Sequence, residues 1–110
     1  MPFAKIKNAV LGEKYQLSLV FVGDKMTQKL NNSYREKNQP TNCLSFPLDK
    51  NSGEIFLNLK KAKKEAPAFG RKFDNFVAFL FIHSCLHLKG FEHGSIMEKA
   101  EAKFTRLFKI

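Results

Sequence analysis

The stretch DNFVAFLFIHSCLHLKG, residues 74–90, decides the fold of this protein. Its first half carries apolar side chains on every side of a helix, and a helix without a polar face is buried. Gly90 favours the left-handed backbone conformation with which many helices end. We therefore expect a buried helix that opens at Asp74 and ends at Gly90.

Upstream of this helix the sequence predicts a strand followed by another helix. Leu17 to Val22 is rich in branched and aromatic residues and alternates in part, which is typical of a strand. Asp24 is suited to cap the following helix through its side chain. Met26, Leu30 and Tyr34 recur there at every fourth position and predict one buried stripe.

A hairpin is expected in the middle of the chain. Residues 36–42 form a polar loop, and Pro40 prevents the preceding helix from running on. Two short strand-like runs, 43–46 and 54–59, flank residues 49–53, which have the composition of a turn. The pairing of the first strand with these two stays open.

Two more helices complete the expected order of elements. Residues 60–66 are predicted to be helical up to Pro67. Ser95 and Glu98 fit a capping box at the start of a last helix. The apolar stripe of that helix comprises Ile96, Ala100, Phe104, Leu107 and Phe108. We expect an α/β or α+β fold in which a small mixed sheet packs with helices.

Length and composition limit the class of protein. The chain has 110 residues, enough for one domain, 1–110, and its 44% hydrophobic content can fill a core. Lys plus Arg is 19 and Asp plus Glu is 10, and the resulting net charge of +9 favours polyphosphates or an anionic membrane surface as partners. Only two cysteines, Cys43 and Cys85, are present, which suits free thiols in a reducing compartment. We expect both to be core residues of the fold. No apolar run is long enough for a signal peptide or a membrane span, so a cytoplasmic protein is expected.

All three histidines of the chain lie between positions 83 and 93. His83 and His87 are four residues apart and therefore share one face of the expected helix. After Gly90 the chain can turn back and bring His93 to the same place. Three neutral imidazoles suit Zn²⁺ or another borderline divalent ion, and they leave one coordination position open, as catalytic zinc sites do. The spacing predicts a metal site at the end of the buried helix, with histidines that merely pack as the alternative.

The spacing HxxxHxxGxxH also invites comparison with zinc peptidases, which have HExxHxxGxxH. Those enzymes place a Glu directly after the first histidine as general base. This chain has Ser84 there, and a hydroxyl without a neighbouring base cannot deprotonate water at neutral pH. Proteolysis is therefore disfavoured.

The densest positive segment begins at Lys60 and ends at Lys72. Lys60, Lys63 and Lys64 share one face of a helix, with Lys61 beside them, and could follow a phosphate backbone. An ordinary solvated lysine face is the alternative. Because no motif with interleaved aromatic residues is visible, we expect contact with a nucleic acid backbone and no base-specific readout.

Three blocks of sequence carry a family resemblance. The stretch HSCLHLKGFEH, residues 83–93, resembles the HGxLHLxGYDH signature of the YbeY family of bacterial rRNA maturation factors. Tyr34-Arg35 and PTNCLSFP, residues 40–47, are similar to the family's YR and PTDVLSFP segments. GEIFL, residues 53–57, lies where the family has GD followed by a strand.

The resemblance implies an α/β metalloprotein with one metal ion per chain, expected to be zinc, on His83, His87 and His93. It implies a metal-dependent endoribonuclease that acts on single-stranded RNA in ribosomal RNA maturation and ribosome quality control. Arg35 matches a functionally important arginine of the family, and its planar guanidinium could hold a phosphate and stabilise charge on it as a catalytic residue. The expected partners are RNA, ribosomal RNA in particular, and the small ribosomal subunit or its proteins, with neither a membrane nor DNA.

The chain departs from the family pattern in four places. Ser84 replaces a Gly after the first histidine, Glu92 replaces an Asp before the third, and Glu54 replaces the Asp of the GD pair. The segment between LSFP and the GD strand is also short. Glu92 is a candidate to orient a histidine, and no residue is evident as general base.

Two alternative functions stay open. The first is a non-catalytic RNA-binding ribosome assembly factor whose metal is structural. The second is a small metallohydrolase that acts on peptides or esters, but this leaves the charge of +9 unexplained.

Overall fold

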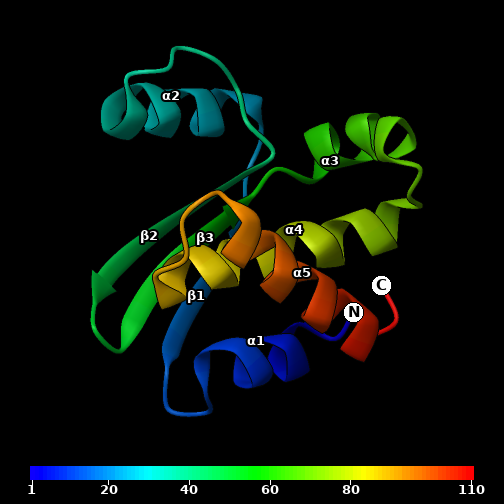
Figure 1. The fold of residues 1–110 in the computed structure, drawn as a ribbon. Coiled ribbons are helices and arrows are strands. Elements are labelled where there is room, and N and C mark those ends of the chain that lie inside the picture. The colour runs from blue at the N-terminus through cyan, green and yellow to red at the C-terminus, as the bar shows by residue number, and fades with distance from the viewer.

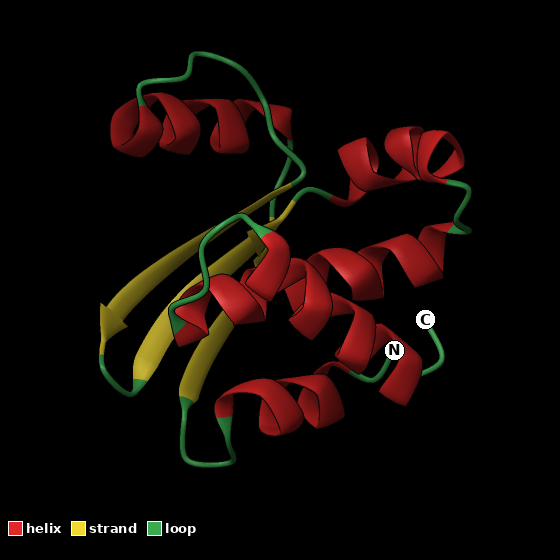
Figure 2. Cartoon of the chain, viewed as in Figure 1, coloured by secondary structure: helices red, strands yellow, loops and turns green.

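The computed structural model describes all 110 residues (Figure 1). The strands are β1 (Gln16–Phe21), β2 (Cys43–Asp49) and β3 (Ser52–Leu57). The helices are α1 (Phe3–Leu11), α2 (Asp24–Arg35), α3 (Leu59–Glu65), the short 3₁₀ helix η1 (Ala66–Phe69), α4 (Phe73–Lys89) and α5 (Ser95–Leu107). Strands and helices together confirm the expected α+β fold with a small mixed sheet (Figure 2). No helix has both the length and the apolar character to cross a membrane.

The sheet has the strand order β1-β3-β2. β2 and β3 are antiparallel neighbours, which confirms the predicted hairpin. β1 runs parallel to β3, with Leu19 beside Ile55. Parallel strands need a long crossover, and the segment containing α2 and β2 provides it. The pairing that the sequence left open is thereby resolved, with β3 in the centre of the sheet.

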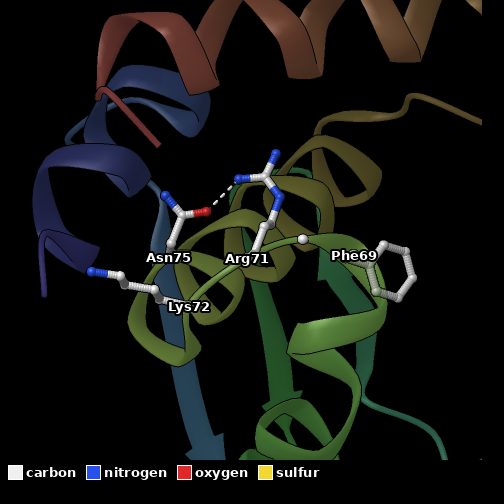
Figure 3. Close-up of a pocket in the computed structure, with 5 residues that line it drawn as sticks. Phe69, Arg71, Lys72 and Asn75 are labelled. Carbon is white, nitrogen blue, oxygen red and sulfur yellow. Dashed lines mark hydrogen bonds between the residues drawn. The ribbon is translucent and has the colours of Figure 1, made fainter.

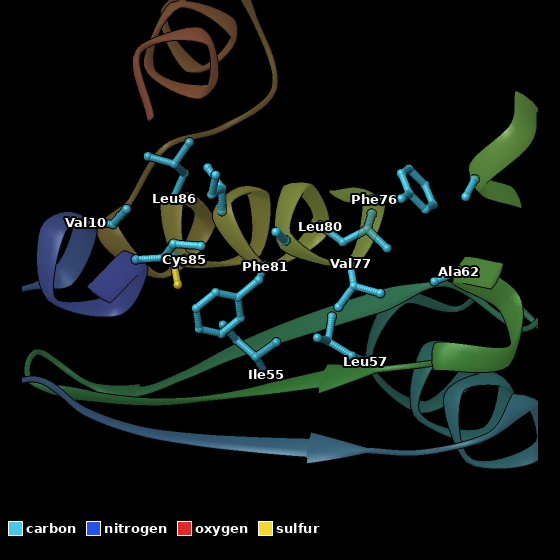
Figure 4. Close-up of a cluster of buried hydrophobic side chains, with 14 of the residues drawn as sticks. Val10, Ile55, Leu57, Ala62, Phe76, Val77, Leu80, Phe81, Cys85 and Leu86 are labelled. Atoms are coloured by element: carbon cyan, nitrogen blue, oxygen red, sulfur yellow. The ribbon is translucent and has the colours of Figure 1, made fainter. Parts of the chain in front are cut away.

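Helix α4 lies between the sheet and α5, as Figure 4 shows for the sheet side and its buried side chains. Phe81 and Val77 point from α4 toward Ile55 and Leu57 of β3, and all four side chains are buried. Because neighbours cover α4 on opposite sides, its apolar residues need no polar face. The predicted buried helix is confirmed, and it begins one residue earlier than expected, at Phe73.

Helix α1 was not among the expected elements. Ile6 and Val10, four residues apart, are buried and place one face of α1 against α4. The Phe3 ring meets the Phe81 ring edge-on, with 4.8 Å between the ring centroids. No side chain caps the start of this short helix, so tertiary packing, and not a local signal, stabilises it.

Helix α2 forms where expected, but its predicted buried stripe is wrong. Met26 and Tyr34 are 45% and 68% exposed, and Leu30 is only half-buried. The buried side chains are Thr27 and Asn31, which hydrogen-bond with the loop that precedes β2. The face that the fold buries is thus the polar one, because α2 covers a polar loop at this end of the sheet.

The expected cap of α2 by Asp24 does not form, since Gly23 is the N-cap and no side chain bonds there. The Asp24 carboxylate instead accepts a hydrogen bond of 2.6 Å from the amide of Asn58. Asn58 is buried, and its side-chain oxygen caps α3 by accepting from the Lys61 backbone N–H at 3.1 Å. One buried amide therefore joins the starts of α2 and α3.

Two details of α5 also differ from expectation. The capping box does not form, because Gly94 is the N-cap and the Ser95 side chain makes no cap hydrogen bond. Met97 is buried, whereas Ile96 and Leu107 are 73% and 61% exposed. The other members of the predicted stripe pack against the core: Ala100, Phe104 and Phe108. The helix therefore turns a slightly different face to α4 than its apolar period indicated.

Candidate metal centre

The three histidines meet where α4 ends. His83 and His87 lie one turn apart on α4, and Gly90 ends the helix in the left-handed conformation at φ 111°. The chain then reverses before α5 begins, and His93 comes back toward the other two rings. The ring centroids of His83 and His93 are 5.4 Å apart, and His87 lies 4.7 Å from the first and 4.8 Å from the second. One nitrogen of each ring lies within 4.8 Å of the others, so this group could hold a metal ion.

Hydrogen bonds orient the first two rings. The Nδ1 atom of His83 lies 3.1 Å from a carboxylate oxygen of Glu101, and Nδ1 of His87 lies 3.0 Å from the carbonyl oxygen of Phe91. A carbonyl or carboxylate oxygen accepts, so each Nδ1 donates its proton. Each neutral ring is thereby left with a lone pair on Nε2. Metal-binding histidines commonly have such partners.

The two Nε2 atoms of His83 and His87 are 3.1 Å apart. If both rings are neutral with the proton on Nδ1, the two Nε2 atoms are both acceptors and no proton lies between them. Two nitrogens that bind one ion tetrahedrally at about 2.0–2.1 Å are themselves about 3.3 Å apart. The donor atoms and their spacing therefore fit a shared divalent cation.

The charge state of His87 suits the same role. Burial, followed by the neighbouring His83, lowers the pKa of His87 below its usual value, and the bond to the Phe91 carbonyl only partly opposes this. A ring with a lowered pKa stays neutral to lower pH. The neutral imidazole is the form that binds metal.

The rings border a pocket of about 170 Å³. Arg35, the last residue of α2, lines this pocket together with the histidines. The other lining residues come from the loop before β2, from β2 and from α4: Thr41, Asn42, Cys43, Ser45 and Ser84. The structure thus brings together all four residues that the sequence had marked as catalytic or metal-binding.

The predicted RNA-binding lysines lie elsewhere. Lys60, Lys63 and Lys64 are exposed on α3, and Lys61 forms an ion pair of 3.7 Å with Glu65. None of the four lines the pocket of the histidines. They form a separate basic surface on α3.

The basic segment continues into a second hollow, between η1 and the start of α4. Arg71, Lys72 and Asn75 line it together with Phe69, as Figure 3 shows. Arg71 donates a hydrogen bond to the Asn75 side chain, and its guanidinium lies 4.4 Å from the centre of the Phe79 ring. Arg71 is thus engaged within the protein, while Lys72 is exposed.

Sequence reasoning missed the residue that holds His83. Glu92, the candidate for orienting a histidine, is exposed and hydrogen-bonds to none of them. Glu101 of α5 does so instead, from eighteen residues beyond His83. No local pattern marks Glu101, because its position depends on how α5 packs on α4.

The cysteines are free thiols and do not belong to the metal group. Cys85 is fully buried in the core, and burial raises the pKa of its thiol to about 12. Cys43 is half-buried in β2 and lines the pocket, and burial raises the pKa of its thiol as well. The prediction that both pack and neither ligates agrees with this arrangement.

The fold and the site together define an α+β protein with a candidate three-histidine metal centre at the end of a buried helix. A family model described as Endoribonuclease YbeY matches residues 3–107. The chain belongs to this family. The resemblance noted from the sequence blocks is thereby confirmed.

Individual relatives agree with the family. The chain is 40% identical over 90 residues to Endoribonuclease YbeY of Aster yellows witches'-broom phytoplasma, which covers 74% of this chain and 62% of that protein. It is 36% identical over 97 residues to Endoribonuclease YbeY of Halalkalibacterium halodurans, covering 74% and 61%. The chain thus spans about three-fifths of the length of these curated relatives.

A solved structure shares the fold. The solution structure of TM1509 from Thermotoga maritima has a TM-score of 0.65 and 24% sequence identity to this chain. The match covers 93% of this chain and 73% of that one. At this identity the likeness supports the fold alone, and the α+β arrangement is the feature in common.

Proposed function

We propose that this chain is a zinc-dependent endoribonuclease that cuts single-stranded RNA in ribosomal RNA maturation and ribosome quality control. The observation that carries the proposal is that Arg35 and the three facing imidazoles line one pocket. Membership of the endoribonuclease YbeY family and a net charge of +9 support an RNA substrate. We place the protein in the cytoplasm, as one domain of residues 1–110, with the small ribosomal subunit or its proteins as further partners.

The histidines are the proposed ligands of a single zinc ion. His83 and His87 would bind through Nε2, because their Nδ1 atoms donate to Glu101 and to the Phe91 carbonyl. His93 completes the set from the turn between α4 and α5. A divalent metal, when bound, supplies polarisation of a phosphate oxygen and acidification of a water molecule.

Arg35 is the proposed phosphate-binding and catalytic residue. It lines the pocket beside the histidines, and its guanidinium forms no ion pair with a carboxylate of the chain. A free planar guanidinium can donate two parallel hydrogen bonds to a phosphate. It would hold the scissile phosphate against the metal centre and stabilise negative charge that develops there.

The lysines of α3 would act at a distance from the chemistry. Lys60, Lys63 and Lys64 point into solvent and are proposed, with Lys61, to contact the RNA backbone. Each phosphate contact steepens the fall of affinity with salt. Replacing one of these lysines by Gln should lower the slope of log affinity against log salt by about one where the contact is made.

Metal content and RNA cleavage test the proposal together. We expect one zinc per wild-type chain, almost none in His87→Ala, and no cleavage by that variant. Arg35→Gln should keep the metal and lose cleavage. Arg106→Gln is the matched control, because Arg106 is also an exposed arginine in the last turn of a helix, α5. Undiminished cleavage by metal-free His87→Ala would refute cleavage at the three-histidine metal centre.

One observation favours a second function, a non-catalytic RNA-binding assembly factor with a structural metal. The pocket is lined by no carboxylate that could serve as general base. In this case zinc is bound as above, RNA binds with the expected salt dependence, and no cleavage is seen with any divalent metal. Cleavage that requires both the metal and Arg35 would support the endoribonuclease over the assembly factor.

A further inference from the structure

A column of aromatic rings stands beside the pocket. Tyr34 of α2 is 68% exposed, and its ring centroid lies 4.9 Å from that of Phe46 on β2. Phe46 in turn lies 5.8 Å from Phe56 on β3. The two phenylalanines are half-buried. Phe46 packs against the tyrosine with the ring planes tilted by 54°, and Phe56 meets Phe46 edge-on. The sequence had placed Tyr34 in a buried stripe, yet most of its surface is open to solvent.

The position of the column relates it to the candidate metal centre. Tyr34 precedes Arg35, and Phe46 follows Ser45, and both of these neighbours line the pocket of the histidines. Successive helix residues diverge by about 100°, and successive strand residues point to opposite faces. The rings therefore lie on the opposite face of β2 from the pocket, one residue along the chain from its lining residues Arg35 and Ser45. Because β2 is an edge strand, no further strand blocks the way around it from the pocket to the column.

The surroundings favour a polyanion as the molecule that covers Tyr34. Helix α2 and its C-terminal loop carry four exposed cations, including Arg35. The other three are Lys25, Lys29 and Lys37. The acids of the same segment are Asp24, which bonds to Asn58, and Glu36. Arg35 and Lys37 are the two cations within three residues of Tyr34. An exposed aromatic ring near cations is the combination with which proteins hold unpaired nucleotides.

We propose that Tyr34, supported by Phe46, is a stacking platform for an unpaired RNA base next to the nucleotide held at Arg35. This inference rests on the proposed function, because it assumes RNA in the pocket of the histidines. A paired base keeps both faces stacked within its duplex and cannot cover Tyr34. The platform would therefore contribute the selectivity for single-stranded RNA, whereas the metal centre and Arg35 contact the phosphate, which duplex and single strand share.

Binding of two RNA probes to the zinc-loaded full chain tests the platform. The probes are a 2′-O-methyl single strand of ten nucleotides and a hairpin whose two strands are joined by a non-nucleotide linker, so that every base is paired, each shown to stay intact during the measurement. Base–aromatic stacking corresponds to roughly 5- to 150-fold in affinity. For a ring with one open face we expect Tyr34→Ala to weaken single-strand binding about tenfold and to leave hairpin binding within twofold. Tyr34→Phe should bind as the wild type does, since it keeps the ring.

A probe series locates the base. Replacing one nucleotide at a time by an abasic unit should weaken wild-type binding at one position. At that position Tyr34→Ala should have no further effect, because ring and base act as one contact. Phe69→Ala is the matched control, since Phe69 is 58% exposed but lies on η1, away from the pocket. An equal loss in Phe69→Ala would overturn a specific platform at Tyr34.

The outcomes separate this inference from the proposed function. Single-strand binding that Arg35→Gln weakens and Tyr34→Ala leaves unchanged would overturn the platform and retain the RNA site. Equal weakening of single strand and hairpin by Tyr34→Ala would also overturn it, because stacking on a paired base is not available. A wild-type chain that binds neither probe would overturn both. Thermal unfolding of Tyr34→Ala near the wild-type temperature shows that the variant is folded.

Discussion

Replacing Glu101 tests whether α5 completes the metal centre from outside the pocket. Glu101 accepts a hydrogen bond of 3.1 Å from Nδ1 of His83, and its side chain is only 14% exposed. Removing the carboxylate leaves His83 free to rotate and to take the other tautomer. We expect both Glu101→Gln and Glu101→Ala to lower zinc affinity, with the larger loss in Glu101→Ala.

The expected loss of zinc affinity follows from the role of Glu101 as the hydrogen-bond partner of His83. Loss of a partner that orients a metal-binding histidine costs about 10- to 100-fold in metal affinity, which corresponds to roughly 1.4–2.7 kcal/mol. In Glu101→Gln an amide oxygen still accepts, and a neutral hydrogen bond is about half as strong as a charge-assisted one. We therefore expect Glu101→Gln to lower zinc affinity about tenfold. Glu101→Ala should approach 100-fold, since little water can reach the vacated position.

Zinc affinity is measured by competition with a chromophoric chelator at fixed pH. Glu98→Gln is the matched control, because Glu98 lies one turn earlier on α5, is exposed and touches no histidine. It should bind zinc as the wild type does. A Glu101→Ala chain that is folded by circular dichroism and keeps wild-type zinc affinity would refute the role of Glu101.

Three further predictions concern stability. Gly53→Ala should lower the free energy of unfolding by roughly 1–3 kcal/mol in chemical denaturation, because a Cβ there would lie 2.5 Å from the Tyr15 hydroxyl. Gly23→Ala is the control, because a Cβ there has nothing within 4 Å, and it should cost less than about 1 kcal/mol. Equal losses in the two variants would contradict this reasoning. The pKa of Cys85, raised from 9.0 to about 12, implies that up to roughly 4 kcal/mol of stability is lost as pH rises from about 9 toward 12, since the unfolded thiol ionises first. Cys85→Ala should remove that part of the alkaline decline, and an unchanged pH profile would count against it. Asn58→Ala removes a helix cap and two hydrogen bonds to α2, so it should cost about 2–3 kcal/mol, and a loss below 0.5 kcal/mol on the same assay would exclude the proposed link between α2 and α3.

Features that depend only on residues close together along the chain could be predicted from the sequence. The apolar run of α4 predicts a buried helix because it leaves no face for water, whatever covers it. His83 and His87 share a helix face because four residues make about one turn. Gly90 allows the left-handed end that turns the chain back to His93. The hairpin of β2 and β3 follows for the same reason, since one short turn sets it.

The faces of the outer helices could not be predicted in the same way. An apolar period shows that a helix has a stripe, but the residues that meet the core depend on where the helix lies. In α2 the buried pair is Thr27 and Asn31, because the loop beneath it offers hydrogen-bonding groups. Met26 and Tyr34 consequently remain outside.

The sequence by itself determined the three strands and the helices α2 to α5, with the buried helix and the spacing of its histidines among them. Only the tertiary structure decided that Arg35 shares their pocket, that Glu101 holds His83 and that Tyr34 stands open beside them. The physical reason is the range of the interactions. Helix period and turns act within a few residues, whereas Arg35 and Glu101 reach the site from α2, which packs on β2, and from α5, which packs on α4.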